Sequence, residues 1–466
     1  MPKIDSLLIG LVAAMSLHAF DDIAIVTMLP EVTRQLGGEI WFGASFFAYL
    51  LLSLVSLVWA GHLTDNDGPR KPFVTGLIVF VIGLLVGAFA QSMPQFVLGR
   101  ALQGFGGGAI QAVVFSAINI AYDEQGRKRA ISLLASAWIL PALLAPMLAG
   151  FVTATWHWSW VFLGMIPLAV IVAITTQRRL AELNRVKTGD AETDPPKPST
   201  SQDEYTRLIK NTARMAAGIG IFLSGLNWFA NSLMLPAFLI VGTCLFWRPL
   251  LALFPTGILL ARPGLSAALA VKCLLVYACL GSEAFLPAFL TDTFNYSTFE
   301  AGSVVTSGAA AWIIATWLFE RHGERFRVSH LLTIGTAILA FGLMLLMAVL
   351  LVLKLPMLVY AAWAVVCFGM GLSYSMAIAE AMKHTDKGTE GATATGAGMV
   401  DAIGFSFASG IGGAVLNITA LYQWDKADSI QLIWIINLSI ALLAVFVAST
   451  RFRLPFDLNN DPKATV

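Results

Sequence analysis

The sequence predicts an all-α membrane protein made of two six-helix pseudo-repeat bundles plus two extra linker helices, fourteen transmembrane helices in all. Of the 466 residues, 57% are apolar and 12% are charged, whereas a soluble domain carries roughly 25% charged residues. A soluble chain could not hide so much apolar surface, because much of any globule remains exposed. Apolar runs long enough to cross a bilayer, about 20 residues, recur along the whole chain.

The first half predicts six spanning helices, which follow the apolar runs at 6–30, 40–62, 72–92, 95–120, 129–153 and 157–176. A polar stretch with Pro195, Pro196 and Pro198 then predicts a solvated linker. The next two runs, 214–229 and 231–248, are short for a full crossing. This pair therefore either spans the membrane or forms a re-entrant hairpin, which would leave twelve spans.

The second half predicts six further helices, over 264–290, 297–319, 328–353, 356–381, 391–420 and 429–450. We therefore expect an N-terminal bundle over 1–176, a cytoplasmic linker over 177–213, two extra short helices over 214–248, a C-terminal bundle over 249–451 and a cytoplasmic tail over 452–466.

Basic residues predict the orientation, because lysine and arginine accumulate in cytoplasmic loops. With a cytoplasmic N-terminus, the outward loops hold only Arg34, Lys354 and Lys426. Three tryptophans around Trp158 then fall at an outward junction, where an aromatic belt is expected. We predict a multi-pass protein of a bacterial-type inner (plasma) membrane, with both termini in the cytoplasm.

The sequence contains no phosphate-binding loop, zinc-protease motif or nucleophile elbow, and its four cysteines lie inside apolar runs without metal-ligand spacing. We therefore expect no enzymatic activity, no cofactor and no metal site, so that any transport must draw on an ion gradient. The net charge of +1 gives no reason to expect a nucleic-acid partner.

Ionisable residues inside the predicted spans are the candidate functional residues, because each costs roughly 2.5–3.5 kcal/mol at mid-membrane. Asp21 and Asp22 are neighbours, so their side chains point about 100° apart, and the depth of Asp21 favours a pair with Arg100. The functional interpretation is a carboxylate whose protonation responds to burial, to the arginine and to an open cavity. The structural interpretation is an ion pair that holds two helices together.

Two more acids lie inside later runs. Glu283 has no basic residue at its depth in its own helix, which suits a proton carrier or a binder of cations, unless it simply meets water near the outer interface. Asp401 lies in a glycine-rich run, where it could be an interhelical hydrogen bonder. Lys272 and Glu380 are nearer the cytoplasmic ends, and their side chains could extend toward water.

Two predicted cytoplasmic loops share an acidic residue, a glycine and a basic residue at the same spacing, which indicates a duplicated six-helix unit. The matched residues are Asp65, Gly68 and Arg70 after the second run, and Glu320, Gly323 and Arg325 after the tenth.

The chain resembles the major facilitator superfamily, in particular its fourteen-helix drug:proton antiporter branch. The resemblance lies in the loop from Gly61 to Lys71, in the runs Leu98–Gly104 and Phe20–Pro30, and in Trp156–Trp160. The fifth-helix antiporter motif is matched only in part, by Ala145–Gly150.

This resemblance implies a proton-coupled secondary transporter that exports small lipophilic drugs, possible cations among them, by alternating access between two helical bundles. Its partners would be the substrate, protons and membrane lipids. The proton-coupling site and substrate cavity would contain Asp21, Asp22, Arg100, Glu283 and Asp401. A conformational latch would contain Gly61, Asp65, Gly68, Arg70, Glu320 and Arg325. The alternative is an exporter of lipids or lipid-like metabolites on the same fold. A nutrient importer fits the motifs less well, and a receptor or non-transporting scaffold would move nothing under a pH gradient.

Overall fold

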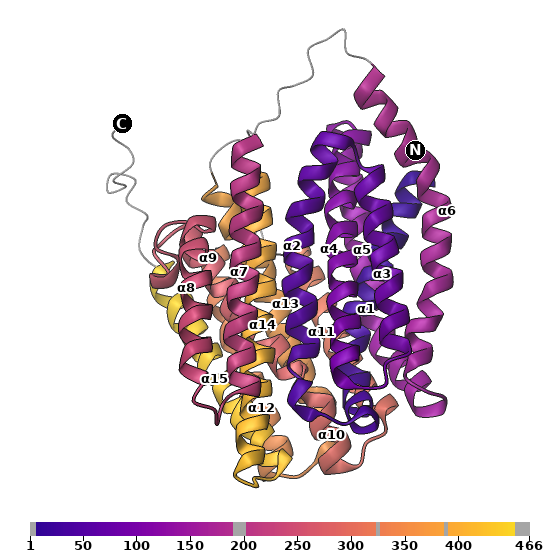
Figure 1. Cartoon of the computed structure of the whole chain (residues 1–466). Coiled ribbons are helices and arrows are strands. Elements are labelled where there is room, and N and C mark those ends of the chain that lie inside the picture. Colours follow the sequence, from indigo (N-terminus) through magenta and orange to yellow (C-terminus); the bar gives the residue numbers. More distant parts are fainter. Residues whose placement is uncertain (1–5, 190–201, 323–326, 386–389, 453–466) are drawn as a thin grey trace. The chain divides into compact units, whose positions relative to one another are not determined.

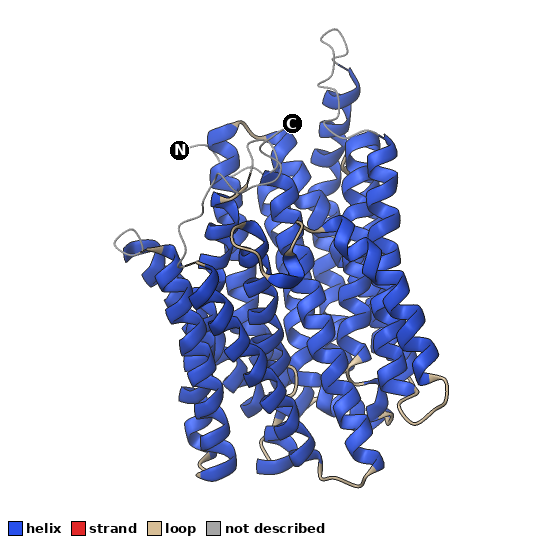
Figure 2. Ribbon diagram, turned by 90° about the vertical axis from the view of Figure 1, so that its left-hand side faces the viewer, coloured by secondary structure: helices blue, strands red, loops and turns tan. Residues whose placement is uncertain are grey.

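The computed structural model describes residues 6–189, 202–322, 327–385 and 390–452. Helices account for most of these residues, loops and turns connect them, and no strand occurs among them (Figure 2). The predicted all-α class is confirmed.

Six long helices form the first part of the chain: α1 (Ser6–Leu36), α2 (Ala44–Asp67), α3 (Arg70–Ala88), α4 (Met93–Ala121), α5 (Glu124–Thr155) and α6 (Ser159–Gly189). Residues that interrupt or cap helices separate them. Gly37, Gly38 and Gly68 adopt positive φ angles of 69°, 80° and 84°, which L-residues avoid. Asp123 caps α5 by accepting a hydrogen bond from the Gly126 N–H at 2.8 Å.

The extra pair consists of α7 (Gln202–Trp228) and α8 (Leu235–Leu253), which lie side by side (Figure 1). Both are longer than the apolar runs predicted, and α7 starts with polar turns inside the stretch predicted as a linker. A Cβ added to Gly218 would lie 2.8 Å from the Gly242 carbonyl oxygen. Small residues of this kind let membrane helices pack backbone to backbone, which favours two packed spanning helices over a re-entrant hairpin.

The rest of the chain contains α9 (Leu265–Glu283), α10 (Leu286–Phe294), α11 (Thr298–His322), α12 (Val328–Met347), α13 (Val359–Lys383), α14 (Glu390–Leu421) and α15 (Lys426–Arg451). The span predicted over 264–290 is therefore not one helix but two, with a break after Glu283. Pro287 lies in the first turn of α10. Its missing N–H is tolerated there, because the first N–H groups of a helix have no partner within it.

Thirteen helical segments of the described residues are long and apolar enough to cross a membrane, with α9 and α10 counted as one segment. The 27 residues of α7 extend about 40 Å at 1.5 Å per residue, which exceeds a bilayer core of about 30 Å. This helix is not among the thirteen, because its first turns are polar; with it the number of spanning helices is fourteen, as predicted. The chain is a multi-pass integral membrane protein.

By its internal contacts the chain forms two compact units. The first unit holds the described residues within 1–253, 283–306 and 405–432, and the second holds those within 254–282, 307–404 and 433–466. Two segments of the second half therefore pack with the first half. The bundle boundaries predicted from the sequence divide the chain differently and stay a prediction.

Within the first unit, α7 joins helices that are far apart in the sequence. The Asn227 side chain donates to the Gly410 carbonyl oxygen of α14 at 2.9 Å, and Asn417 donates to the Asn227 carbonyl oxygen at 3.2 Å. At the other end of α7, the Tyr205 hydroxyl donates to the Asp65 carboxylate of α2. The extra helix is thus bonded to α2 at one end and to α14 at the other.

Candidate functional site

Asp21 and Arg100 form a buried ion pair between α1 and α4. Arg100 Nη1 donates to Asp21 Oδ2 at 3.0 Å and to Gln103 Oε1 at 2.7 Å. The Arg100 and Asp21 side chains are 1% and 0% exposed. The contact expected from the sequence is therefore present, and removal of either partner would leave an uncompensated buried charge.

Aromatic and imidazole rings complete this site. The guanidinium carbon of Arg100 lies 4.2 Å from the centroid of the Tyr49 ring, a cation–π contact. The Tyr49 hydroxyl lies 2.9 Å from His18 Nδ1, within hydrogen-bond distance. Gly107 leaves room for the histidine, because a Cβ there would collide with Nδ1. We define the N-terminal cluster as His18, Asp21, Tyr49, Arg100 and Gln103.

Two buried atoms of the N-terminal cluster, Asp21 Oδ1 and Gln103 Nε2, have no hydrogen-bond partner among the described residues. An unpaired buried polar atom costs about 1–3 kcal/mol. Such atoms are uncommon in native proteins and often lie where a proton or water acts.

Asp22 and Glu283 form a separate acidic site in the first unit. Both residues are half-buried, and neither has a hydrogen bond or ion pair with a described residue. Their charges act on each other electrostatically. The Asp22 side chain points in a different direction from that of Asp21, because successive residues of a helix are rotated by about 100°. Glu283 is the last residue of α9, directly before the break in the span.

A row of phenylalanine rings begins with Phe285, two residues after Glu283 in the sequence. Phe285 stacks on Phe42 with ring centroids 5.4 Å apart, and Phe42 lies 5.9 Å from Phe46. Phe46 in turn lies 5.4 Å from Phe405. All four rings are buried, so they form part of the packed interior of the first unit.

The second unit contains a corresponding group, which we define as the C-terminal cluster: Lys272 of α9, Tyr374 of α13, and Ala397 and Asp401 of α14. Lys272 Nζ donates to the Ala397 carbonyl oxygen at 2.7 Å and to Asp401 Oδ1, and it lies 4.4 Å from the centroid of the Tyr374 ring. The Tyr374 hydroxyl donates to Asp401 Oδ2 at 2.8 Å.

The expectation that Lys272 extends toward water is wrong. Its side chain is 2% exposed, whereas that of Asp401 is 28% exposed. The reason is that Asp401 and the Ala397 carbonyl offer the ammonium group two acceptors inside the second unit. Glu380 instead accepts a hydrogen bond from Lys383 at 3.1 Å near the end of α13.

The predicted latch residues are only partly described. Gly68 follows the last residue of α2. Asp65 accepts the Tyr205 hydrogen bond, and the His62 ring centroid lies 4.7 Å from that of Tyr205.

The other latch residues are Gly61, Arg70, Glu320 and Arg325. Gly61 lies within α2 with open space at the position of a Cβ, and Arg70 is exposed at the start of α3. Glu320 lies in α11 but its side chain is not described, and Arg325 lies outside the described residues.

Sequence reasoning missed four members of the N-terminal and C-terminal clusters: His18, Tyr49, Gln103 and Tyr374. Each is a polar side chain inside an apolar run, a signal that was present but weaker than a formal charge. Tyr205 was missed because it lies in the stretch predicted as a solvated linker.

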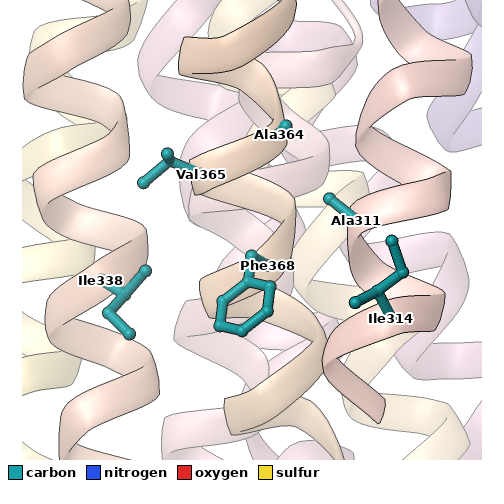
Figure 3. A pocket seen from close by; sticks show the side chains of 6 residues that line it. All are labelled: Ala311, Ile314, Ile338, Ala364, Val365 and Phe368. Atoms are coloured by element: carbon teal, nitrogen blue, oxygen red, sulfur yellow. The ribbon is translucent and has the colours of Figure 1, made fainter. Parts of the chain in front are cut away.

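A groove in the second unit is distinct from both clusters (Figure 3). It has a volume of about 310 Å³ and is lined by apolar side chains of α11, α12 and α13, namely Ala311, Ile314, Ile338, Ala364, Val365 and Phe368. These side chains could contact an alkyl chain, but they include no group that would orient a charged ligand.

These features define a polytopic helical membrane protein that keeps ionised side chains inside its spans, and in such proteins interior charges usually mark paths for ions and solutes. The chain belongs to the Major Facilitator Superfamily, whose sequence model matches residues 11–282. The sequence model described as PUCC protein matches residues 291–453. The superfamily is a family of transporters.

Two relatives match most of the chain. The multidrug transporter protein MdtP of Bacillus subtilis is 24% identical over 425 residues, which cover 88% of this chain and 75% of that protein. A probable multidrug-efflux transporter of Mycobacterium tuberculosis is 22% identical over 451 residues, which cover 96% of this chain and 94% of that protein.

Solved structures share the fold. The POT family transporter PepTSo matches with a TM-score of 0.67 and 11% identity, covering 97% of this chain and 99% of its own. An auto-inhibited POT family peptide transporter matches with a TM-score of 0.68 and 14% identity, covering 98% and 99%. At these identities the likeness concerns the fold alone.

Proposed function

We propose that this protein is a proton-coupled secondary transporter that exports lipophilic compounds, cations among them, by alternating access. One observation carries the proposal: two adjacent carboxylates on α1 have opposite surroundings. Asp21 is sealed against Arg100, whereas Asp22 is half-buried, without an ion-pair partner among the described residues. The multidrug transporters among its relatives support the same class of substrate.

Asp22 and Glu283 would bind the transported cation or a proton. Two like charges in a partly buried site repel each other, and neither carboxylate forms an ion pair with a described basic residue, although the charge of Arg100 acts on Asp22. A proton or a lipophilic cation relieves that repulsion. Because one site serves both ligands, they compete, and competition between proton and substrate is the basis of exchange.

Asp21 would couple proton binding to movement. Neutralisation of its carboxylate removes the charge that holds Arg100 beside α1. The pair joins α1 to α4, so its loss frees the two helices to shift. A change at one buried pair can favour a second arrangement of packed helices.

Contacts at the end of the helices that we predict to face outward would close that side. Lys426 Nζ lies 2.9 Å from Glu39 Oε1 and 2.8 Å from Asp292 Oδ2. The Thr298 hydroxyl donates to the Gly150 carbonyl oxygen at 3.0 Å. All of these residues belong to the first unit. The latch predicted from the sequence, with Asp65 and Arg70 in one loop and Glu320 and Arg325 in another, stays a prediction.

The test is a transport assay in proteoliposomes with an imposed pH gradient and tetraphenylphosphonium as the lipophilic cation. Asp21→Asn should abolish gradient-driven transport while the protein remains folded. Asp22→Asn combined with Glu283→Gln should lose both cation binding and the competition by protons. Asp428→Asn, an exposed acid at the start of α15, is the matched control and should transport normally.

Unchanged transport by Asp21→Asn would remove this residue from the mechanism. If the unaltered protein moves phospholipid but neither tetraphenylphosphonium nor neutral lipophilic compounds under the same gradient, the drug-export proposal fails and the lipid exporter replaces it.

A further inference from the structure

The C-terminal cluster has no role in the transport cycle described above. Its ion pair is asymmetric: the ammonium of Lys272 is buried, whereas the carboxylate of Asp401 is partly exposed. A purely structural pair gains nothing from this arrangement, because water weakens the attraction between the charges. The asymmetry does allow a solute to reach the carboxylate without passing the lysine.

The contacts of Lys272 show what happens when another cation arrives. Its ammonium has two oxygen acceptors, Ala397 O and Asp401 Oδ1, and the face of the Tyr374 ring. If a cation occupies Asp401, Lys272 keeps only a neutral carbonyl and a ring. A buried charge with such weak compensation is costly, so the lysine competes with the incoming cation for the carboxylate.

We propose that Asp401 is a second proton-binding site of the transporter, occupied in the absence of the proton by the tethered ammonium of Lys272. The proposal rests on the proposed function, since it adds a coupling site to a proton-driven exporter. The step is a proton transfer only: one proton from water binds the Asp401 carboxylate, and the Lys272 ammonium leaves that oxygen while keeping its own protons.

The neighbours of Asp401 fit this role. The described titratable groups that act on it are Lys272 and Cys273 from α9 and Tyr374 from α13. The Tyr374 hydroxyl holds Oδ2 at 2.8 Å, which leaves Oδ1 as the oxygen that changes partner. Gly404, one turn further along α14, packs against the Cys273 backbone and so fixes α14 beside α9.

The experiment counts protons. In proteoliposomes held at zero membrane potential, the cation ratio at which the protein-dependent flux of tetraphenylphosphonium reverses is measured over a series of pH gradients, with protein-free liposomes subtracted for passive leak. The slope of the logarithm of this ratio against the pH difference equals the number of protons exchanged per cation. The variant combines Lys272→Met with Asp401→Asn, which removes both charges and leaves no uncompensated lysine. The matched control combines Lys383→Met with Glu380→Gln.

We expect the slope of the Lys272–Asp401 double variant to be lower by one than that of the unaltered protein, and the slope of the control to be unchanged. An unchanged slope in the double variant would overturn the inference and leave the proposed function intact. A slope of zero in the unaltered protein would overturn proton coupling itself, and the inference with it.

A second measurement decides the matter if the double variant does not transport. A water-soluble carbodiimide modifies protonated carboxyl groups that water can reach, and mass spectrometry locates the modified residue. Asp401 should be modified in the folded, unaltered protein, increasingly so as the pH falls. Modification of Asp401 no greater than that of Asp21 would overturn the inference.

Discussion

The N-terminal and C-terminal clusters use the same kinds of side chain, an acid, a base and a tyrosine, but they differ in exposure. Arg100 and Asp21 are both sealed, whereas the C-terminal cluster seals its base and leaves its acid 28% exposed. Exposure changes both the cost of breaking a pair and the access of a ligand to it. The sealed pair is suited to holding two helices, and the partly exposed pair to exchanging its cation.

The largest difference is expected when the base is replaced by an apolar residue of similar length. Arg100→Met leaves Asp21 charged and fully buried, so the free energy of unfolding should fall by about 3–5 kcal/mol. Lys272→Met leaves Asp401 partly exposed and should cost about 1–2 kcal/mol, between the values for exposed and buried pairs. Denaturant titration of the purified proteins in detergent measures both. Equal losses would contradict the comparison.

A smaller difference is expected for the tyrosines. Tyr49→Phe removes the partner of His18, whose ring is buried, and should cost about 1–3 kcal/mol. Tyr374→Phe removes a hydrogen bond to Asp401, where water can take its place, and should cost about 0.5–1.5 kcal/mol. The same titrations measure the two variants, and a larger loss for Tyr374→Phe would show that water does not reach Asp401.

The smallest effect is expected at an ion pair that is mostly outside the protein. Lys71 and Asp67 form such a pair, with side chains 70% and 42% exposed, so Lys71→Met should change the free energy of unfolding by less than about 0.5 kcal/mol. The loss of unfolding free energy in this variant is the reference value for an exposed ion pair. If its loss matched that of Lys272→Met, the C-terminal cluster would behave as an ordinary surface pair.

The sequence allowed the Asp21–Arg100 contact to be predicted because both charges lie at the same depth in two neighbouring spans. The Lys272–Asp401 contact was missed for two reasons. The partners are 129 residues apart, and their meeting depends on which faces of α9 and α14 turn toward each other. A lysine near a helix end also has a second option, extension into water, and composition does not decide between the two.

The fold could be predicted more fully than the site, because an apolar run of bilayer length seldom forms anything but a spanning helix. The wrong predictions concern where helices begin and break, and not how many spans the chain has. The apolar run over 264–290 gave no sign of a break except Pro287, and the early start of α7 was hidden by its polar turns. Helix ends depend on local hydrogen bonds, which hydropathy does not measure.

The bonds of α7 bear on whether the extra pair of helices could be removed from the chain. Excising 202–248 would leave Asn417 without its hydrogen-bond acceptors on Asn227, deprive the Gly410 carbonyl oxygen of its side-chain donor, and remove the Tyr205 hydroxyl from Asp65. The pair is therefore not a removable insertion. A shorter descendant would have to acquire compensating substitutions on α14 and α2 at the same time as the deletion.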